Sequence, residues 1–318
     1  MSAPFFTQYS PAEIRHLFHG VQVSPILPYQ SSPMVDEEFE QHETGCISVS
    51  GAQEKYSLVM DGTTLRYARR GEQGQYILKP RPHRMKLRAD MPVNEWLSMS
   101  LAGSVFGLPT AACTLCFYGD GEPAYLTQRF DLKPDGTKRR MEDLAALANV
   151  HTQGNSGTKY EGSYESLAAL IARFAIAPRI QLSFFFRYLV VNFLLCNGDA
   201  HMKNFALLED DAGGMVLAPV YDMMNTRLHV EDTPFALSRG LFDDARPVNP
   251  RGMGAHFLDW GAQIGLPERL CARFLAQALS HQSVVEQCIH SSCLSPKASH
   301  AYLSHVRERF IRLQKGTN

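Results

Sequence analysis

Three polar residues near the most apolar part of the chain have the types and spacing that phosphoryl transfer to a hydroxyl group requires. Asp199 follows the apolar run 182–196, Asn204 lies five positions later, and Asp222 lies in the later turn "VYDMM". Such a reaction needs a carboxylate that accepts or orients the hydroxyl proton. It also needs an amide oxygen and a second carboxylate that hold Mg²⁺ against the nucleotide phosphates. We therefore predict Asp199 as the catalytic carboxylate, and Asn204 and Asp222 as metal ligands.

The segment Asp199-Ala-His-Met-Lys-Asn204 reproduces the D-x-x-x-x-N spacing of protein-kinase catalytic loops. This pattern is common by chance, but here it lies between an apolar helix and the apolar "FALL". We expect His201 and Lys203 to brace the loop, and Lys203 could also reach a phosphate. The alternative is a buried polar network that ties two helices together.

The first third of the chain contains residues that could hold a nucleotide. The segment "SVSGAQEK" (48–55) lies between two strand-like runs, and Gly51 would let the backbone approach phosphates closely. Lys79 ends the apolar strand "YILK", where its ammonium group needs an anionic partner unless it is simply solvated. Glu95, early on the next helix, could pair with Lys79, although Asp90 is also near.

The elements that must position these residues change along the chain. Residues up to about 130 are rich in strand patterns, with a hairpin turn at "DGTT" and one helical segment. From Met141 onward the periodicity is helical. We expect strands around 46–68, at 74–80 and within 110–131, and helices at 92–108, 164–175, 180–196, 266–279 and 298–314.

This order predicts an α+β fold with two lobes. Residues 1–131 would form a small β-rich lobe with the Gly-rich nucleotide loop, and residues 132–318 a larger helical lobe with the catalytic and metal-binding loops.

Composition narrows the functional classes. The 318 residues carry a formal net charge of −1, so no overall basic field indicates nucleic acid as the main ligand. The N-terminal residues do not resemble a signal peptide, and the longest apolar run is too short to span a bilayer. Seven cysteines without regular spacing are typical of reduced thiols, so we expect a cytoplasmic protein.

Five segments, taken in order over about 46–225, resemble the HipA family of bacterial toxin kinases: "SVSGAQEK", "YILKP", "QRFD", "NGDAHMKNF" and "YD". The resemblance implies a serine/threonine protein kinase that uses ATP and Mg²⁺. It also implies an aminoacyl-tRNA synthetase as the substrate, whose phosphorylation inhibits translation and arrests growth. Tryptophanyl-tRNA synthetase is the first expectation and glutamyl-tRNA synthetase the second.

The resemblance also assigns roles by position. Asp199, His201 and Lys203 match the catalytic loop, Asn204 and Asp222 the metal ligands, and Glu95 the partner of Lys79. The implied nucleotide-binding residues are Ser50, Gly51, Ala52, Gln53, Lys55, Lys79, Gln128, Phe130 and Asn204. Gln128 and Phe130 fall at the hinge, where the family more often has Glu at the first position.

One departure from the family concerns the N-terminal part. Full-length HipA proteins have an additional subdomain before the Gly-rich turn, whereas Gly51 here follows only fifty residues. The chain therefore resembles the short HipT type, in which that subdomain is a separate protein of a three-component system. The implied partners are a HipS-like small protein and a HipB-like DNA-binding antitoxin. We expect no direct contact of the chain with nucleic acid or membrane.

Ser48 and Ser50 match the region in which family members phosphorylate themselves. A phosphate adds roughly −1.5 to −2 charges, which would repel a bound triphosphate or draw the loop toward basic residues. We therefore expect both serines to be regulatory phosphorylation sites. The alternative is that they only make hydrogen bonds within the turn.

Two other functions remain open. A small-molecule kinase of the aminoglycoside or choline type uses a related loop and the same metal ligands. A catalytically inactive binding module, acting as an antitoxin or corepressor, is the second possibility. The presence of Lys79, Asp199, Asn204 and Asp222 together argues against the inactive module, since decay usually removes one such group.

Overall fold

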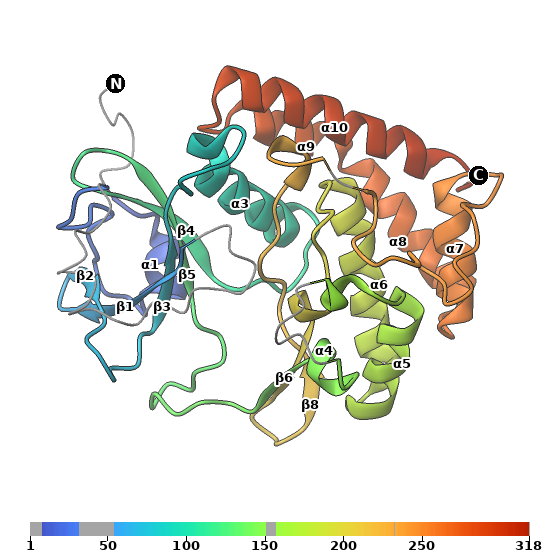
Figure 1. Cartoon of the computed structure of the whole chain (residues 1–318), viewed down its shortest axis with the longest axis horizontal. Coiled ribbons are helices and arrows are strands. Elements are labelled where there is room, and N and C mark those ends of the chain that lie inside the picture. Colours follow the sequence, from blue (N-terminus) through green and yellow to red (C-terminus); the bar gives the residue numbers. More distant parts are fainter. Residues whose placement is uncertain (1–7, 32–53, 151–156, 232, 318) are drawn as a thin grey trace. The chain divides into compact units, whose positions relative to one another are not determined.

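The computed structural model of the protein describes residues 8–31, 54–150, 157–231 and 233–317 (Figure 1). The chain divides into two compact units. The small unit comprises Met1–Trp96 and Ala111–Thr137, and the large unit comprises Leu97–Thr110 and Lys138–Asn318. Among the described residues, none of the helices has both the length and the apolar character needed to cross a membrane.

The small unit is built on a five-stranded antiparallel sheet with the strand order β2-β1-β3-β5-β4. The strands are β1 (Tyr56–Asp61), β2 (Thr64–Tyr67), β3 (Tyr76–Lys79), β4 (Cys113–Phe117) and β5 (Pro123–Gln128). Asp61 pairs with Thr64 across the expected tight turn, where Gly62 has a positive φ of 60°. Tyr76 to Lys79 pair with Gln128 to Tyr125, so β3 is held on both sides.

Helix α1 (Pro11–Leu17) was not expected from the sequence. It begins with a capping box, in which the Ser10 hydroxyl accepts from the Glu13 backbone N–H and the Glu13 carboxylate accepts from the Ser10 N–H. Leu17 and Phe18 at its end join the core of the small unit, together with Leu58 and Leu78 of the sheet.

Helix α3 (Met91–Ser100) begins after a short 3₁₀ turn, Arg88–Asp90, and continues as a π-helical turn over Leu101–Val105. The helix expected at 92–108 is therefore present, but its last part is wound differently. Residues 97–110 group with the large unit, although they precede the boundary expected from the sequence.

The large unit is mainly helical. Its helices are α4 (Leu144–Leu147), α5 (Tyr164–Phe174), α6 (Pro178–Leu194), α7 (Met253–Gln263), α8 (Glu268–Ser280), α9 (Gln282–His290) and α10 (Pro296–Gln314). Eleven of the seventeen residues of α6 are buried, because α6 packs against α5, α8 and α10. Its Phe186 stacks on Trp260 of α7 with ring centres 5.7 Å apart. Apolar residues all around α6 thus mark a helix that is enclosed by the unit.

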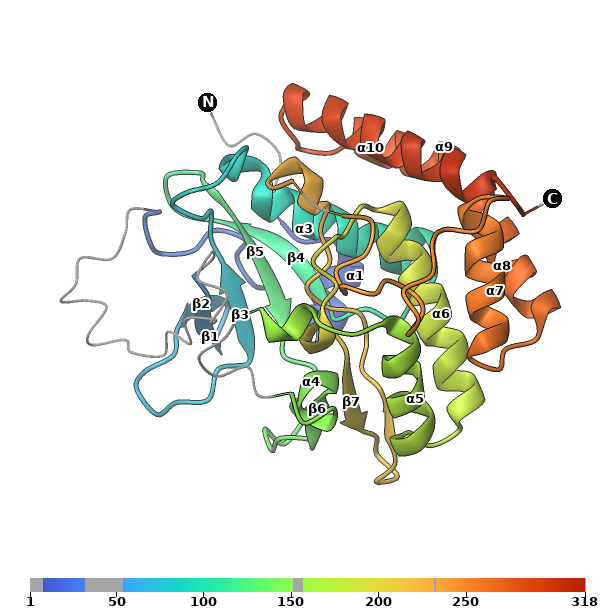
Figure 2. The same ribbon diagram turned by 45° about the vertical axis from the view of Figure 1, so that its right-hand side comes forward.

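The helical periodicity expected from Met141 onward overlooks a small antiparallel sheet. Its strands are β6 (Met141–Asp143), β7 (Ala206–Glu209) and β8 (Met215–Leu217), in the order β6-β7-β8. Strands of three or four residues are too short to show a clear alternation in the sequence. Both views place this sheet beside α4 (Figures 1 and 2). It matters for the site because β7 follows the loop that carries Asp199.

Candidate active site

The loop between α6 and β7 carries the residues predicted to be catalytic. Helix α6 ends at Leu194, two residues before the expected end, and Cys196 turns the chain with a left-handed φ of 59°. Asp199 is half-buried, and a short 3₁₀ turn, Met202–Asn204, leads into β7. The buried helix thus ends in a loop that presents polar groups.

Thr226 anchors the start of this loop. Its hydroxyl donates to the carbonyl of Cys196 at 3.0 Å and accepts from the backbone N–H of Gly198 at 2.8 Å. In addition, the side-chain amide of Asn197 donates to Asn192 Oδ1 on α6 at 2.7 Å. The backbone just before Asp199 is therefore held from two sides.

A tyrosine links the loop to the turn that contains Asp222. The Tyr188 hydroxyl of α6 lies 3.4 Å from the carbonyl oxygen of Asn204 and 3.3 Å from that of Tyr221. The Tyr221 hydroxyl in turn donates to the carbonyl of Lys203 at 2.8 Å. These bonds bring Asn204 and the neighbour of Asp222 together on one side of the loop.

Asp222 has a left-handed φ of 53° and is half-buried. Asp and Asn adopt this conformation more readily than most side chains. The turn therefore suits the residue type that the predicted metal-binding role requires.

Asn204 also stabilises the catalytic loop. The side-chain Oδ1 of Asn204 accepts from the backbone N–H of His201 at 3.2 Å. The backbone N–H of Asn204 donates to the carbonyl of His201 at 2.9 Å. An amide oxygen has two lone pairs, so Oδ1 can accept this bond and still contact a cation. The side chain is buried, with 6% exposed.

His201 is neutral at physiological pH. Burial lowers its pKa from 6.5 to about 4, with the Asp199 carboxylate opposing and the Lys159 ammonium reinforcing this shift. His201 immediately precedes the 3₁₀ turn, and its backbone N–H and carbonyl both bond to Asn204. Lys203 is half-buried, and its backbone carbonyl is the group that Tyr221 contacts.

Tyr160 contacts the site and was not found from the sequence. Its hydroxyl donates to Asp199 Oδ1 at 2.6 Å, and its ring meets the His201 ring edge-on at 5.3 Å. The Lys159 ammonium lies 4.9 Å from the centre of the same ring. Tyr160 stands 39 residues before Asp199, and no spacing or motif links the two positions.

In the small unit, Lys79 of β3 forms an ion pair with Glu95 of α3. Lys79 Nζ lies 2.5 Å from Glu95 Oε1, and the residues are 3% and 0% exposed. The Lys79 ammonium also lies 5.4 Å from the ring centre of Tyr125. Lys79 is therefore not a solvated strand-end lysine.

The other predicted nucleotide-binding residues are only partly described. Gln128 is half-buried, its N–H donates to the carbonyl of Ala112, and its Nε2 lies 2.8 Å from His19 Nε2. Lys55 and Phe130 are also half-buried. The remaining positions lie outside the described residues: Ser48, Ser50, Gly51, Ala52 and Gln53.

The side chains of the large unit fit a magnesium ion that is shared with a nucleotide. In the described part of the chain, no group of three or more His, Cys, Asp or Glu side chains could hold a metal. Mg²⁺ is usually held by one or two carboxylates together with substrate phosphates and water. One carboxylate, Asp222, and one amide oxygen, from Asn204, match that donor set.

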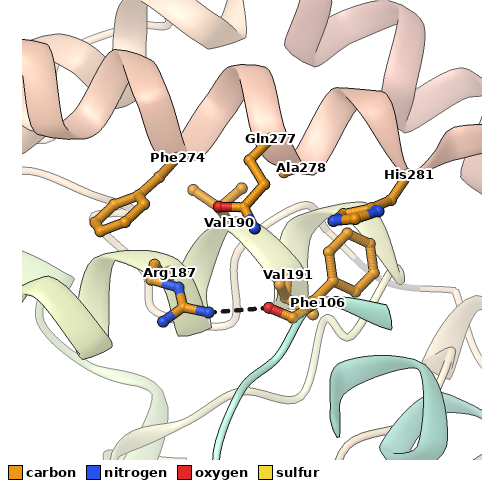
Figure 3. A pocket seen from close by; sticks show the side chains of 8 residues that line it. All are labelled: Phe106, Arg187, Val190, Val191, Phe274, Gln277, Ala278 and His281. Carbon is orange, nitrogen blue, oxygen red and sulfur yellow. Dashed lines mark hydrogen bonds between the residues drawn. The ribbon is translucent and has the colours of Figure 1, made fainter. Parts of the chain in front are cut away.

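A small cavity of about 20 Å³ lies elsewhere in the large unit, between α6 and α8 (Figure 3). Arg187 lines it and donates to the carbonyls of Phe106 and Gly107 at 2.9 and 3.0 Å. A cavity of this size holds about one water molecule. None of the predicted site residues that the structure describes lines it; its walls are Phe106, Arg187, Val190, Val191, Phe274, Gln277, Ala278 and His281.

Comparison with known protein families gives one match over most of the chain. The model of the HipA-like C-terminal domain matches residues 47–285. A Haemophilus influenzae protein described as "Putative kinase" is 25% identical over 324 residues, covering 96% of this chain and 92% of that protein. The Sinorhizobium fredii protein "Putative kinase Y4mE" is 28% identical over 192 residues, which cover 59% of this chain and only 44% of that protein.

Two solved structures share the fold. HipA of Shewanella oneidensis, in a toxin–antitoxin complex with HipB and operator DNA, superposes with a TM-score of 0.65 at 20% identity, covering 88% of this chain and 71% of that one. The Helicobacter pylori proinflammatory kinase CtkA gives a TM-score of 0.55 at 15% identity, covering 82% and 90%. The α+β, two-lobed HipA-like fold expected from the sequence is confirmed.

Proposed function

The chain belongs to the family of proteins with a HipA-like C-terminal domain, and we propose that it is a toxin kinase that transfers the γ-phosphate of ATP to a protein hydroxyl. The observation that carries this proposal is the hydrogen bonding around Tyr188. The Tyr188 hydroxyl contacts the backbone carbonyls of both Asn204 and Tyr221. Asn204 is on the loop that carries Asp199, and Tyr221 precedes Asp222, so this tyrosine links the loop to the turn that contains Asp222.

In the proposed reaction, Asp199 accepts the proton of the attacking hydroxyl as its oxygen bonds to the γ-phosphorus, while the bond from that phosphorus to the oxygen of the β-phosphate breaks and ADP leaves. Asn204 and Asp222 would hold Mg²⁺, which when bound neutralises charge on the phosphates. Lys203, on the same loop as Asp199, is proposed to contact a phosphate, and neutral His201 to hold the shape of the loop rather than exchange protons. Lys79, already paired with Glu95, would bind nucleotide phosphates.

For the acceptor, we propose a serine or threonine of an aminoacyl-tRNA synthetase. The support is the resemblance of several motifs to HipA toxin kinases. Phosphorylation of a synthetase would stop tRNA charging and so inhibit translation. Tryptophanyl-tRNA synthetase is the first candidate and glutamyl-tRNA synthetase the second. An acceptor of this kind also implies a cytoplasmic location for the proposed kinase.

For partners, we propose a HipB-like DNA-binding antitoxin and a HipS-like small protein. The Shewanella HipA structure contains HipB and operator DNA, which supports an antitoxin of this kind. Any contact with DNA would then come through the partner.

The test is incubation of the purified protein with γ-labelled ATP and Mg²⁺, alone, with a panel of aminoacyl-tRNA synthetases, and with an aminoglycoside or choline as a small-molecule acceptor. We expect label on one synthetase, and none with Asp199→Asn. Label that appears only on a small metabolite would instead indicate a small-molecule kinase. Bound ATP without any transfer would indicate an inactive binding module.

Regulation would act through Ser48 and Ser50. A phosphate on either serine would place negative charge in the proposed nucleotide loop and weaken ATP binding. We expect mass spectra of protein incubated with ATP to show phosphate on one or both serines. Spectra in which both always remain unmodified in active protein would reject this mode of regulation.

A further inference from the structure

We propose that Tyr160 is a positioning residue for phosphoryl transfer, because its hydroxyl holds one oxygen of Asp199 and leaves the other for the acceptor hydroxyl. This inference rests on the proposed function. The hydroxyl lies 2.6 Å from Asp199 Oδ1, the length of a strong hydrogen bond to a charged group.

The direction of this bond follows from chemistry. An ionised carboxylate can only accept hydrogen bonds, so Tyr160 must be the donor. Burial raises the pKa of Tyr160, and the hydrogen bond to the Asp199 carboxylate raises it further, so the phenol keeps its proton. A carboxylate turns easily about its last torsion, and a fixed donor on Oδ1 limits that motion.

The backbone around Tyr160 is held firmly. Its carbonyl accepts from the N–H of Ser238 at 2.8 Å. Two further bonds continue the same pairing, from Arg239 N–H to the Gly162 carbonyl and from Tyr164 N–H to the Gly240 carbonyl, both at 3.0 Å. Tyr160 is therefore a fixed part of the large unit rather than the tip of a loop that swings away.

The ring of Tyr160 is also fixed. It meets His201 of the catalytic loop edge-on, and the buried Lys159 side chain places its ammonium over the ring. The contacts with His201 and Asp199 come from the same loop, so one tyrosine sets both the position of the loop and the rotation of the carboxylate.

A different role is that the Tyr160 hydroxyl occupies the place of the acceptor hydroxyl and blocks the site. Such a block must be released before each turnover. The three backbone bonds made by Tyr160, Gly162 and Tyr164 argue against easy release. The two roles predict opposite effects of removing the hydroxyl.

The test is Tyr160→Phe, which removes the hydroxyl and keeps the ring against His201. We expect kcat for labelled phosphate transfer to fall by about 10- to 100-fold, since small errors in the position of a reacting group have effects of this size. KM for ATP, ATP affinity by calorimetry and the number of ATP-binding sites should stay within about twofold, because ATP does not contact this hydroxyl in the proposed reaction.

Tyr302→Phe is the matched control. It removes a buried tyrosine hydroxyl that lies 2.7 Å from Ser98 Oγ in the same unit, far along the chain from the catalytic loop. We expect it to lower the unfolding temperature at least as much as Tyr160→Phe does, but to keep kcat per ATP-binding site.

Three outcomes would overturn the inference. Unchanged kcat in Tyr160→Phe would show that the hydroxyl does not position Asp199. A rise in kcat/KM for the protein acceptor would show that Tyr160 blocks the site. A fall in kcat matched by an equal fall in ATP-binding sites would show a structural role only. No transfer by the wild-type protein would instead reject the proposed function itself, and this role of Tyr160 with it.

Discussion

Lys79 Nζ and Glu95 Oε1 lie 2.5 Å apart, and their side chains are 4% and 0% exposed. The pair joins strand β3 to helix α3 inside the small unit. A buried ion pair is weak evidence for stability alone, because the loss of hydration offsets most of the attraction. Because Lys79 occupies the position expected for a nucleotide-binding lysine, a role of the pair in ATP binding can be tested.

We expect Lys79→Met to lower the free energy of unfolding by about 3–5 kcal/mol, because it removes the ammonium that compensates the buried Glu95 carboxylate. The double variant Lys79→Met/Glu95→Leu should recover most of that loss, since it removes both charges. Urea unfolding measures the stabilities, and calorimetry measures ATP affinity. If the stable double variant bound ATP as tightly as the wild type, Lys79 would have no role in nucleotide binding.

The proposed metal-binding role of Asp222 can be separated experimentally from its backbone conformation. Asp222→Asn keeps a residue that tolerates the left-handed φ of 53° but loses the charge. We expect its stability to change little and the Mg²⁺ concentration needed for half-maximal transfer to rise by at least tenfold.

Asp222→Ala is the companion variant and should lose about a further 1 kcal/mol of stability, because alanine is strained at this φ. A magnesium requirement that is the same in Asp222→Asn and the wild type would remove Asp222 from the metal site.

Thr226 should affect catalysis through the backbone of the loop. Thr226→Val keeps the shape of the side chain but removes its hydrogen bonds to Cys196 and Gly198. We expect this variant to lower the free energy of unfolding by about 1–3 kcal/mol and to lower kcat. Thr226→Ser keeps the hydroxyl and is the control, with kcat near that of the wild type. Equal kcat in the valine and serine variants would show that these bonds do not matter for the reaction.

The buried His201 should make stability depend on pH. Its pKa is about 4 in the folded protein and about 6.5 in the unfolded chain. Between these values only the unfolded chain binds the proton, so stability falls as the pH falls from about 6.5 toward 4. The charged neighbours that bear on this pKa are Asp199, Asp222 and Lys159.

Between pH 7 and pH 5, we expect the free energy of unfolding to fall by about 2 kcal/mol more in the wild type than in His201→Gln. Urea unfolding at both pH values measures this difference. Parallel pH dependence in the two proteins would mean that His201 titrates normally.

The parts of the site that could be predicted from the sequence are those whose residues lie close together along the chain. Asp199 and Asn204 share one loop, and Lys79 lies 16 residues before Glu95, within a strand and the next helix. In contrast, the contact of Tyr160 with Asp199 depends on the pairing of the segment around Gly162 with that around Arg239. Pairings between irregular segments leave no periodic signal in a single sequence.

The fold shows the same limit. The long helix α6 and the hairpin at Gly62 could be predicted because their patterns extend over many residues or use a specific turn type. The short strand β6 pairs with β7 more than sixty residues later in the chain. Its three residues, "MED", carry too little pattern to indicate a strand.

The most direct test of the proposed chemistry compares wild type and Asp199→Asn in a single-turnover transfer of labelled phosphate, with ATP affinity measured on the same samples. We expect the variant to bind ATP within about twofold of the wild type and to transfer phosphate at least about 100-fold more slowly, because it lacks the group that accepts the proton. Equal transfer rates at equal ATP affinity would contradict the assignment of Asp199 as the catalytic carboxylate.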